Sequence, residues 1–115
     1  MPVFEILTWR ALPSVADDDM VDAMAGFSEA VKTLPGFIHQ SLYKNAQGQW
    51  VCIYFWQTEA EAHASNTAVA GLKVFENLMR LIEAGSVTME VLSALQSSDS
   101  EEALADRSTP TVPGS

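Results

Sequence analysis

The chain has 115 residues, of which 48% are hydrophobic and 18% charged, and its formal net charge is -9. This composition is typical of one soluble globular domain, and so acidic a chain is repelled by a nucleic-acid backbone or an anionic membrane surface. The single cysteine, Cys52, excludes an internal disulfide, and no apolar stretch approaches the about 20 residues of a membrane span. We therefore expect a cytoplasmic protein with no nucleic-acid or membrane partner.

The first two predicted elements are a strand and an amphipathic helix. Residues 3–10 form a mostly apolar run typical of a strand. From Met20 to Leu34, apolar residues recur at intervals of three and four, which predicts a helix with one buried face. Three aspartates, residues 17–19, suit the positive end of its dipole, with Asp17 or Asp18 as the cap. A metal site is the weaker interpretation of this triplet, because consecutive helical residues point about 100° apart.

The segment Leu34 to Gln57 predicts one β-hairpin with its turn at residues 45–48. With that turn, positions whose numbers sum to 93 face each other, so His39 would meet Tyr54 and Tyr43 would meet Trp50. One face would then mix aromatic and polar side chains, namely Phe37, His39, Ser41, Tyr43, Trp50, Cys52, Tyr54 and Trp56. The other would be ordinary core, with Ile38, Leu42, Val51, Ile53 and Phe55. Such a mixed face suits a small organic ligand.

The remainder of the chain predicts helix, strand and tail. Thr58 and Glu59 begin a second helix, whose inward stripe we assign to Ala60, His63, Ala64 and Thr67. Gly71 interrupts this helix, an apolar stripe continues to Ile82, and residues 87–95 alternate as a last strand. The methionines at positions 20, 24, 79 and 89 are expected to fill the core. We expect a folded domain over residues 1–96 and a disordered tail over residues 97–115.

The predicted order β-α-β-β-α-β favours an α+β fold of the ferredoxin-like type, a four-stranded antiparallel sheet with both helices on one face. Helices then cover only one sheet face, whereas the strands carry apolar residues on both. Because the second face needs another cover, we expect a homodimer.

Four motifs in this order resemble the antibiotic biosynthesis monooxygenase-like family of the dimeric α/β-barrel superfamily. They are Leu34-Pro35-Gly36-Phe37, the strand from Trp50 to Trp56, the junction from Trp56 to Ala62, and the segment from Phe75 to Met89. The resemblance spans roughly residues 3–95 and implies two sheets packed face to face in a homodimer, with a pocket between helices and sheet in each subunit. It also implies oxygenation of electron-rich phenols of the anthrone type without metal or flavin, so we expect no cofactor.

Haem degradation, which other relatives perform, is doubtful for this chain. Those relatives use an Asn in the first strand and an axial His in the second long helix, where this chain has Thr8-Trp9-Arg10 and Phe75.

The candidate site residues divide into proton carriers and ligand contacts. His63, His39 and Tyr54 are the candidate catalytic residues, because a histidine beside a phenol can move a proton near neutral pH. The candidate ligand-binding residues are Trp56, Trp50, Tyr43, Phe75 and Arg10. The structural alternatives are core packing for Trp56, a core or rim position for His63, a surface or dimer seam for His39, and strand-end solvation for Arg10. No metal-ligand spacing, CxxC motif or Ser-His-Asp order is present, so no metal site is predicted.

Two function classes remain open. In the first, a homodimer binds a small aromatic or polyketide-like molecule and oxygenates it without a cofactor, because a deprotonated, electron-rich substrate can itself pass an electron to oxygen. The alternative is a non-catalytic ligand-binding or stress-response dimeric barrel. Cyclisation or isomerisation of a similar ligand is a third possibility.

Overall fold

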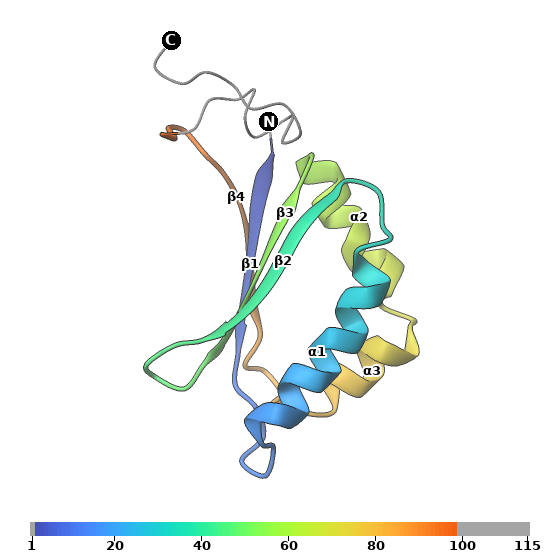
Figure 1. Ribbon diagram of the computed structural model, residues 1–115, viewed down its shortest axis with the longest axis vertical. Helices are drawn as coiled ribbons and strands as arrows, with labels where there is room; N and C mark the ends of the chain where they lie inside the picture. Colours follow the sequence, from blue (N-terminus) through green and yellow to red (C-terminus); the bar gives the residue numbers. More distant parts are fainter. Residues whose placement is uncertain (1, 99–115) are drawn as a thin grey trace.

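A four-stranded sheet with helices packed on one face makes up the computed structural model, which describes residues 2–98 (Figure 1). Its elements in chain order are β1 (Val3–Trp9), α1 (Asp17–Val31), β2 (Phe37–Lys44), β3 (Trp50–Trp56), α2 (Glu59–Val69), α3 (Lys73–Met79) and β4 (Thr88–Ser93). The predicted ferredoxin-like α+β fold is confirmed, with the second helical region divided into α2 and α3 around Gly71. The predicted tail lies outside the described residues from residue 99 onward. No helix within residues 2–98 has the length and apolar character needed to cross a membrane.

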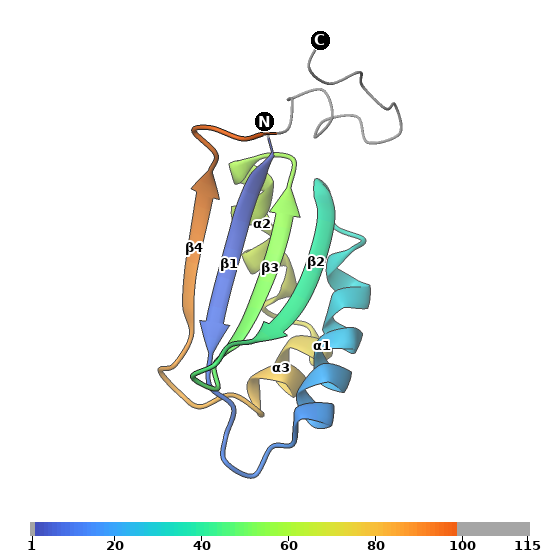
Figure 2. The ribbon, with the colours of Figure 1, turned by 60° about the vertical axis from the view of Figure 1, so that its left-hand side comes forward.

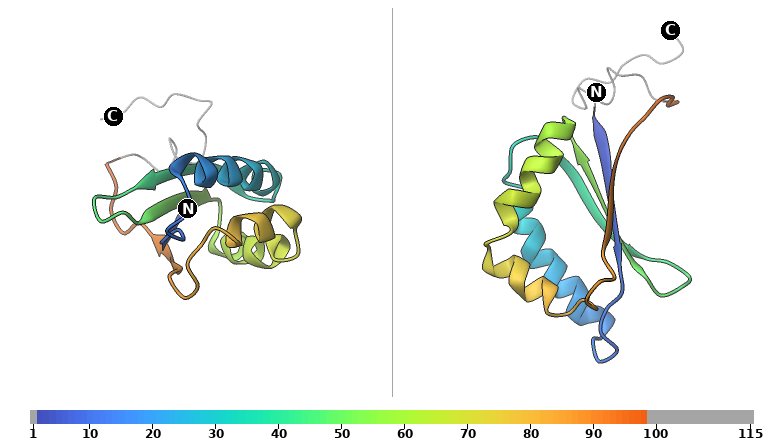
Figure 3. Two further views of the ribbon diagram at one scale, coloured as in Figure 1. Left: turned by 90° about the horizontal axis from the view of Figure 1, so that it is seen from below. Right: turned by 180° about the vertical axis from the view of Figure 1, so that it is seen from behind.

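The strands are ordered β2-β3-β1-β4, and each neighbouring pair is antiparallel (Figure 2). The side chains of Val3, Glu5 and Trp9 in β1 and of every second residue of β3 from Trp50 to Trp56 are buried. Because side chains alternate between faces along a strand, these residues form the face under the helices. The opposite face bears Phe4 and Ile6 of β1 with Val51, Ile53 and Phe55 of β3, and none of the three helices covers it (Figure 3).

The predicted hairpin register is wrong by one residue over most of its length. Lys44 pairs with Trp50, and Gln40, in place of His39, pairs with Tyr54. The cause lies in the turn, where the Asn45 N–H donates to the carbonyl of Gln49 at 2.9 Å and the Asn45 side chain accepts from the Gln49 N–H at 2.9 Å. Asn45 and Gln49 therefore close the turn, one residue later than predicted.

A β-bulge lies between Phe37 and His39. Beyond it, at the end of the hairpin away from the turn, Phe37 pairs with Trp56 as predicted. The side chains are therefore distributed between the two faces of the sheet differently from the prediction. His39 and Tyr43 share the uncovered face with Val51 and Phe55, whereas Trp50, Tyr54 and Trp56 of β3 lie beneath the helices. A one-residue slip moves every side chain of a strand to the other face, so the expected mixed face does not exist.

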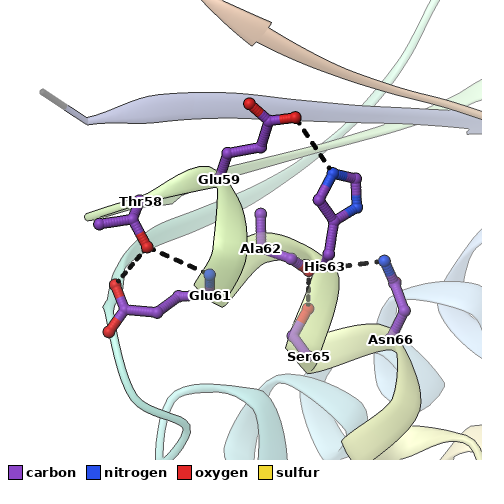
Figure 4. Close-up of polar contacts among 7 residues, drawn as sticks. All are labelled: Thr58, Glu59, Glu61, Ala62, His63, Ser65 and Asn66. Carbon is purple, nitrogen blue, oxygen red and sulfur yellow. Dashed lines mark hydrogen bonds and ion pairs between the residues drawn. The ribbon is translucent and has the colours of Figure 1, made fainter.

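Both long helices begin with side-chain capping, although not always by the predicted residue. Thr58 caps α2 as predicted, because its hydroxyl accepts from the Glu61 N–H at 3.1 Å (Figure 4). In α1 the N-cap is Ala16, so assigning the cap to Asp17 or Asp18 was wrong. The Asp19 carboxylate instead accepts from the Ala16 N–H at 3.0 Å, and Asp17 forms an ion pair of 2.8 Å with Lys44 at the end of β2.

The inward face of α2 also differs from the prediction. Ala62, Ser65 and Val69 are its buried residues, whereas the side chain of His63 is 56% exposed and lies 3.3 Å from the Glu59 carboxylate one turn earlier (Figure 4). Alanines occupy both buried and exposed positions of this helix, so its sequence gives no clear indication of which side faces the sheet.

Candidate functional site

A cavity of about 300 Å³ lies between the sheet and the helices. Most of its lining is apolar, and the lining residues are Glu5, Leu7, Trp9, Met24, Phe27, Val31, Cys52, Tyr54, Trp56, Ser65, Asn66, Val69, Phe75, Leu78, Met79, Ile82, Val87 and Met89. This volume is at the small end of the range of ligand sites.

The cavity opens on the side of the edge strand β4. Of its lining residues, Met79, Val87 and Met89 are exposed to solvent. Two of these were expected in the core, so the prediction that all four methionines fill the core is wrong for Met79 and Met89. Neither α1 nor α2 lies over β4 (Figures 2 and 3).

The principal polar group in the cavity is the carboxyl of Glu5, which is only 2% exposed. Its Oε1 accepts a 2.9 Å hydrogen bond from the indole N–H of Trp56, which is 1% exposed. Its Oε2 is buried and has no hydrogen-bond partner among residues 2–98. Burial raises the pKa of Glu5, and the hydrogen bond from Trp56, the nearby amide of Asn66 and the charge of His63 oppose the rise. The Asn66 amide does not reach Oε2 with hydrogen-bond geometry and is directed to the carbonyl of Ala62. The indole therefore fixes one carboxyl oxygen and leaves the other unpaired.

A second unpaired polar group lies further along the same strand. The indole Nε1 of Trp9 is buried and has no acceptor within the described part of the chain. Trp9 and Glu5 point to the same face of β1 and both line the cavity. Buried polar groups in proteins are usually hydrogen-bonded, so these two groups are exceptions, and both lie in one cavity.

Tyr54 and Cys52 face the cavity from β3, beside Glu5 and Leu7 of β1 respectively. Burial raises the pKa of both the Tyr54 phenol and the Cys52 thiol, so both groups stay neutral at physiological pH. From α2, the Ser65 hydroxyl donates to the carbonyl of Ala62 at 2.6 Å, and the Asn66 amide lies 3.5 Å from the same oxygen (Figure 4). Glu5 is therefore the group in this lining whose charge state is most readily changed.

The structure brings three of the sequence-predicted residues together in this cavity: Tyr54, Trp56 and Phe75. The rings of Tyr54 and Trp56 stack with centroids 6.1 Å apart. Trp50 is buried beyond the lining, and the ammonium of Lys44 lies 5.2 Å from the centre of its ring.

The other candidates lie elsewhere. His39 and Tyr43 are exposed on the uncovered face of the sheet, and the His39 ring contacts Phe55 with centroids 5.8 Å apart. The expected proximity of His39 to Tyr54 is therefore wrong. Arg10 is exposed after β1 and donates to the carbonyl of Gln47 at 3.2 Å. His63 faces solvent, so its expected position on the inward stripe is wrong as well.

Glu5, Trp9 and Asn66 were not among the sequence-predicted site residues. Val3, Glu5, Leu7 and Trp9 alternate with the other residues of β1, so the signal for Glu5 was an acid in the middle of an inward apolar row. For Asn66 no comparable signal exists, because its orientation depends on the rotation of α2. No group of three or more potential ligand side chains within residues 2–98 is arranged to hold a metal ion.

Comparison with solved structures places this geometry among known folds. SnoaB of Streptomyces nogalater, a cofactor-independent oxygenase, is 15% identical, with a TM-score of 0.70 over 84% of this chain and 95% of that chain. The fold is that of the antibiotic biosynthesis monooxygenase-like proteins. Another solved antibiotic biosynthesis monooxygenase is also 15% identical, with a TM-score of 0.64 over 82% of this chain and 99% of that one.

Rv0793 of Mycobacterium tuberculosis is 17% identical, with a TM-score of 0.67 over 86% of this chain and all of that one, 100%. No family model and no curated protein matches the chain. The resemblance that the four sequence motifs indicated is thus confirmed at the level of the fold.

Proposed function

We propose that this protein is a homodimer that binds a small aromatic or polyketide-like molecule in the cavity between sheet and helices and oxygenates it without a cofactor. The observation that carries the proposal is the cavity itself, about 300 Å³ of mostly apolar lining with a few polar groups. Small-molecule sites have this composition, in which apolar walls supply affinity and a few polar groups supply orientation. The similarity of the fold to a cofactor-independent oxygenase supports the choice of reaction.

Tyr54, Trp56 and Phe75 would form the aromatic walls of the ligand site, because all three line the cavity. Aromatic side chains bind flat ring systems by stacked or edge-on contacts. A ligand enclosed in the cavity is removed from water. Exclusion of water favours electron transfer from the anion of the ligand to oxygen, because proton exchange with water does not compete.

A homodimer is supported by the uncovered face of the sheet. Phe4, Ile6, Val51, Ile53 and Phe55 form an apolar centre on that face, and each of them is only partly buried in the single chain. A second copy packed face to face would bury these side chains and place His39 and Tyr43 at the seam. Apolar faces of this kind are typical of association surfaces.

Non-catalytic ligand binding remains the second candidate, and one observation favours it. Neither His39 nor His63, the expected proton carriers, lines the cavity. Under this alternative the same cavity binds the same class of molecule without turnover.

Oxygen uptake and ligand binding, measured together with an anthrone, test the proposal. We expect saturable binding, consumption of oxygen and formation of the quinone. Met89→Trp should weaken binding and turnover, because it narrows the mouth of the cavity, whereas the control Val21→Trp on the exposed side of α1 should change neither. Binding without oxygen uptake supports the non-catalytic alternative, and equal effects of the two variants contradict the assignment of the cavity.

A further inference from the structure

The cavity contains two polar atoms that the protein leaves unpaired, Glu5 Oε2 and Trp9 Nε1. Each is buried, each belongs to a side chain of β1 that lines the cavity, and neither has a hydrogen-bond partner among the described residues. Leaving a buried polar group unpaired costs about 1–3 kcal/mol. A ligand that supplies both partners would recover this free energy, and this gives a criterion for its chemistry.

We infer that Glu5 Oε2 and Trp9 Nε1 are the two anchor points of the ligand, which carries a hydroxyl group at one end and a carbonyl-type acceptor at the other. This inference rests on the proposed ligand site and specifies the substrate class that the site selects. The hydroxyl donates to the carboxylate oxygen, and the indole N–H of Trp9, which only donates, binds the acceptor.

The spacing of the two anchors limits the length of the ligand. Glu5 and Trp9 are four residues apart on one face of a strand, which separates their Cα atoms by about 13 Å. A ligand that reaches both anchors therefore has to be elongated, with its polar groups at opposite ends. A skeleton of two fused aromatic rings with substituents at opposite ends has this form.

The Trp56 indole fixes the polarity of the Glu5 anchor. Because the Trp56 N–H donates to Oε1 at 2.9 Å, the atom at the Oε1 position has to be a hydrogen-bond acceptor. In the variant Glu5→Gln, the same N–H selects the amide oxygen and turns the amide NH₂ into the cavity. This isosteric substitution therefore replaces an acceptor with a donor at the Oε2 position and keeps the shape of the site.

Protonation of Glu5 would reverse the polarity in the same way, so hydroxyl binding should strengthen as the pH rises. The titratable groups that act on Glu5 are Tyr54 and Cys52 from β3, which burial keeps neutral, and His63 from α2. His63 affects Glu5 only through its charge, from an exposed position. Burial raises the pKa of Glu5, so the change in hydroxyl binding comes above the ordinary glutamate range.

The test uses four probes with one skeleton: naphthalene, 2-naphthol, 2-acetylnaphthalene and 6-hydroxy-2-acetylnaphthalene. Their dissociation constants are measured by calorimetry with the full chain from about pH 5 to about pH 8, a range in which 2-naphthol stays neutral and a buried glutamate can titrate. We expect the probe with both groups to bind most tightly and the preference for 2-naphthol over naphthalene to grow with pH.

Two variants test the two anchors independently. Glu5→Gln should weaken the binding of 2-naphthol about tenfold at the upper end of the pH range, which corresponds to the loss of one charge-assisted hydrogen bond. The same variant should abolish the pH dependence of 2-naphthol binding. Trp9→Phe should abolish the preference for 2-acetylnaphthalene over naphthalene and leave the preference for 2-naphthol unchanged. The controls Glu29→Gln, which removes an exposed charge on α1, and His63→Ala should both retain the hydroxyl preference.

The outcomes distinguish this inference from the proposed function on which it rests. If all four probes bind equally well, or if Glu5→Gln and Trp9→Phe shift all four affinities together, the anchor assignment is wrong while the cavity remains the ligand site. If none of the four probes binds, both the ligand site and its anchors are refuted.

Discussion

Replacing Trp56 by Phe should destabilise the protein through one identifiable hydrogen bond. The indole N–H donates to Glu5 Oε1 at 2.9 Å, and the two side chains are 1% and 2% exposed, so water does not replace the lost donor. Losing a hydrogen bond to a charged acceptor costs about 1.5–3 kcal/mol, which applies at a pH where Glu5 is ionised. In a domain of this size that loss lowers the melting temperature by roughly 6–24 °C.

The chain offers a matched control at Trp9. Trp9→Phe makes the same change in ring size at a residue that is 3% exposed and lines the same cavity, but its indole N–H has no partner within residues 2–98. The difference between the two variants in free energy of unfolding therefore isolates the hydrogen bond. We expect Trp56→Phe to be the more destabilising by at least about 1 kcal/mol, measured by urea denaturation at fixed pH.

A double-mutant cycle with Glu5→Gln completes the test. In the glutamine background the Trp56 N–H still donates, but to a neutral acceptor, so Trp56→Phe should cost less than in the wild-type protein. Equal losses for Trp56→Phe and Trp9→Phe, together with no coupling in the cycle, would refute the assignment of this hydrogen bond as a stabilising contact.

Three further predictions concern charge, association and the surface. Because the pKa of Glu5 is raised in the folded state above its ordinary value of 4.5, the native protein retains a proton that the unfolded chain releases, and the free energy of unfolding should fall as the pH rises above that value. Glu5→Gln should remove this part of the pH dependence in denaturation curves recorded across the acidic and neutral range. Ile53→Glu on the uncovered sheet face should convert the proposed dimer to a folded 12.5 kDa monomer in sedimentation, and a monomeric wild-type protein would contradict the dimer. His63→Ala should change the free energy of unfolding by no more than about 0.5 kcal/mol, because the ion pair between His63 and Glu59 is exposed. A larger loss of stability would show that His63 is buried where two copies of the chain associate.

Removing residues 97–115 should leave the melting temperature within a few degrees of the full chain. The reason is compositional, since this segment offers few apolar side chains to bury. Calorimetry of the truncated and full chains measures the difference, and a large loss would show that the segment packs on the folded domain.

Local signals in the sequence determined the order of the elements and several of their ends. Apolar residues recur in α1 with the helical period, Thr58 stands where a cap is needed, and Asn45 to Gly48 supply a turn between two strands. These features depend on residues close together in the chain, so the sequence alone carries them. The uncovered apolar face followed as well, because a sheet with helices on one side leaves the other side free.

Tertiary structure decided which side chains share a face and which reach the cavity. The pairing of β2 with β3, in which Asn45 and Gln49 close the turn, differs by one residue from the expected register, and this places His39 and Tyr54 on opposite faces of the sheet. Packing against the sheet sets the rotation of α2 about its axis. In this orientation His63 faces outward and Ser65 faces inward. Glu5 lines the cavity because β1 lies inside the sheet and places Glu5 beside Trp56, where burial removes water from the carboxyl and the indole pairs with only one of its oxygens.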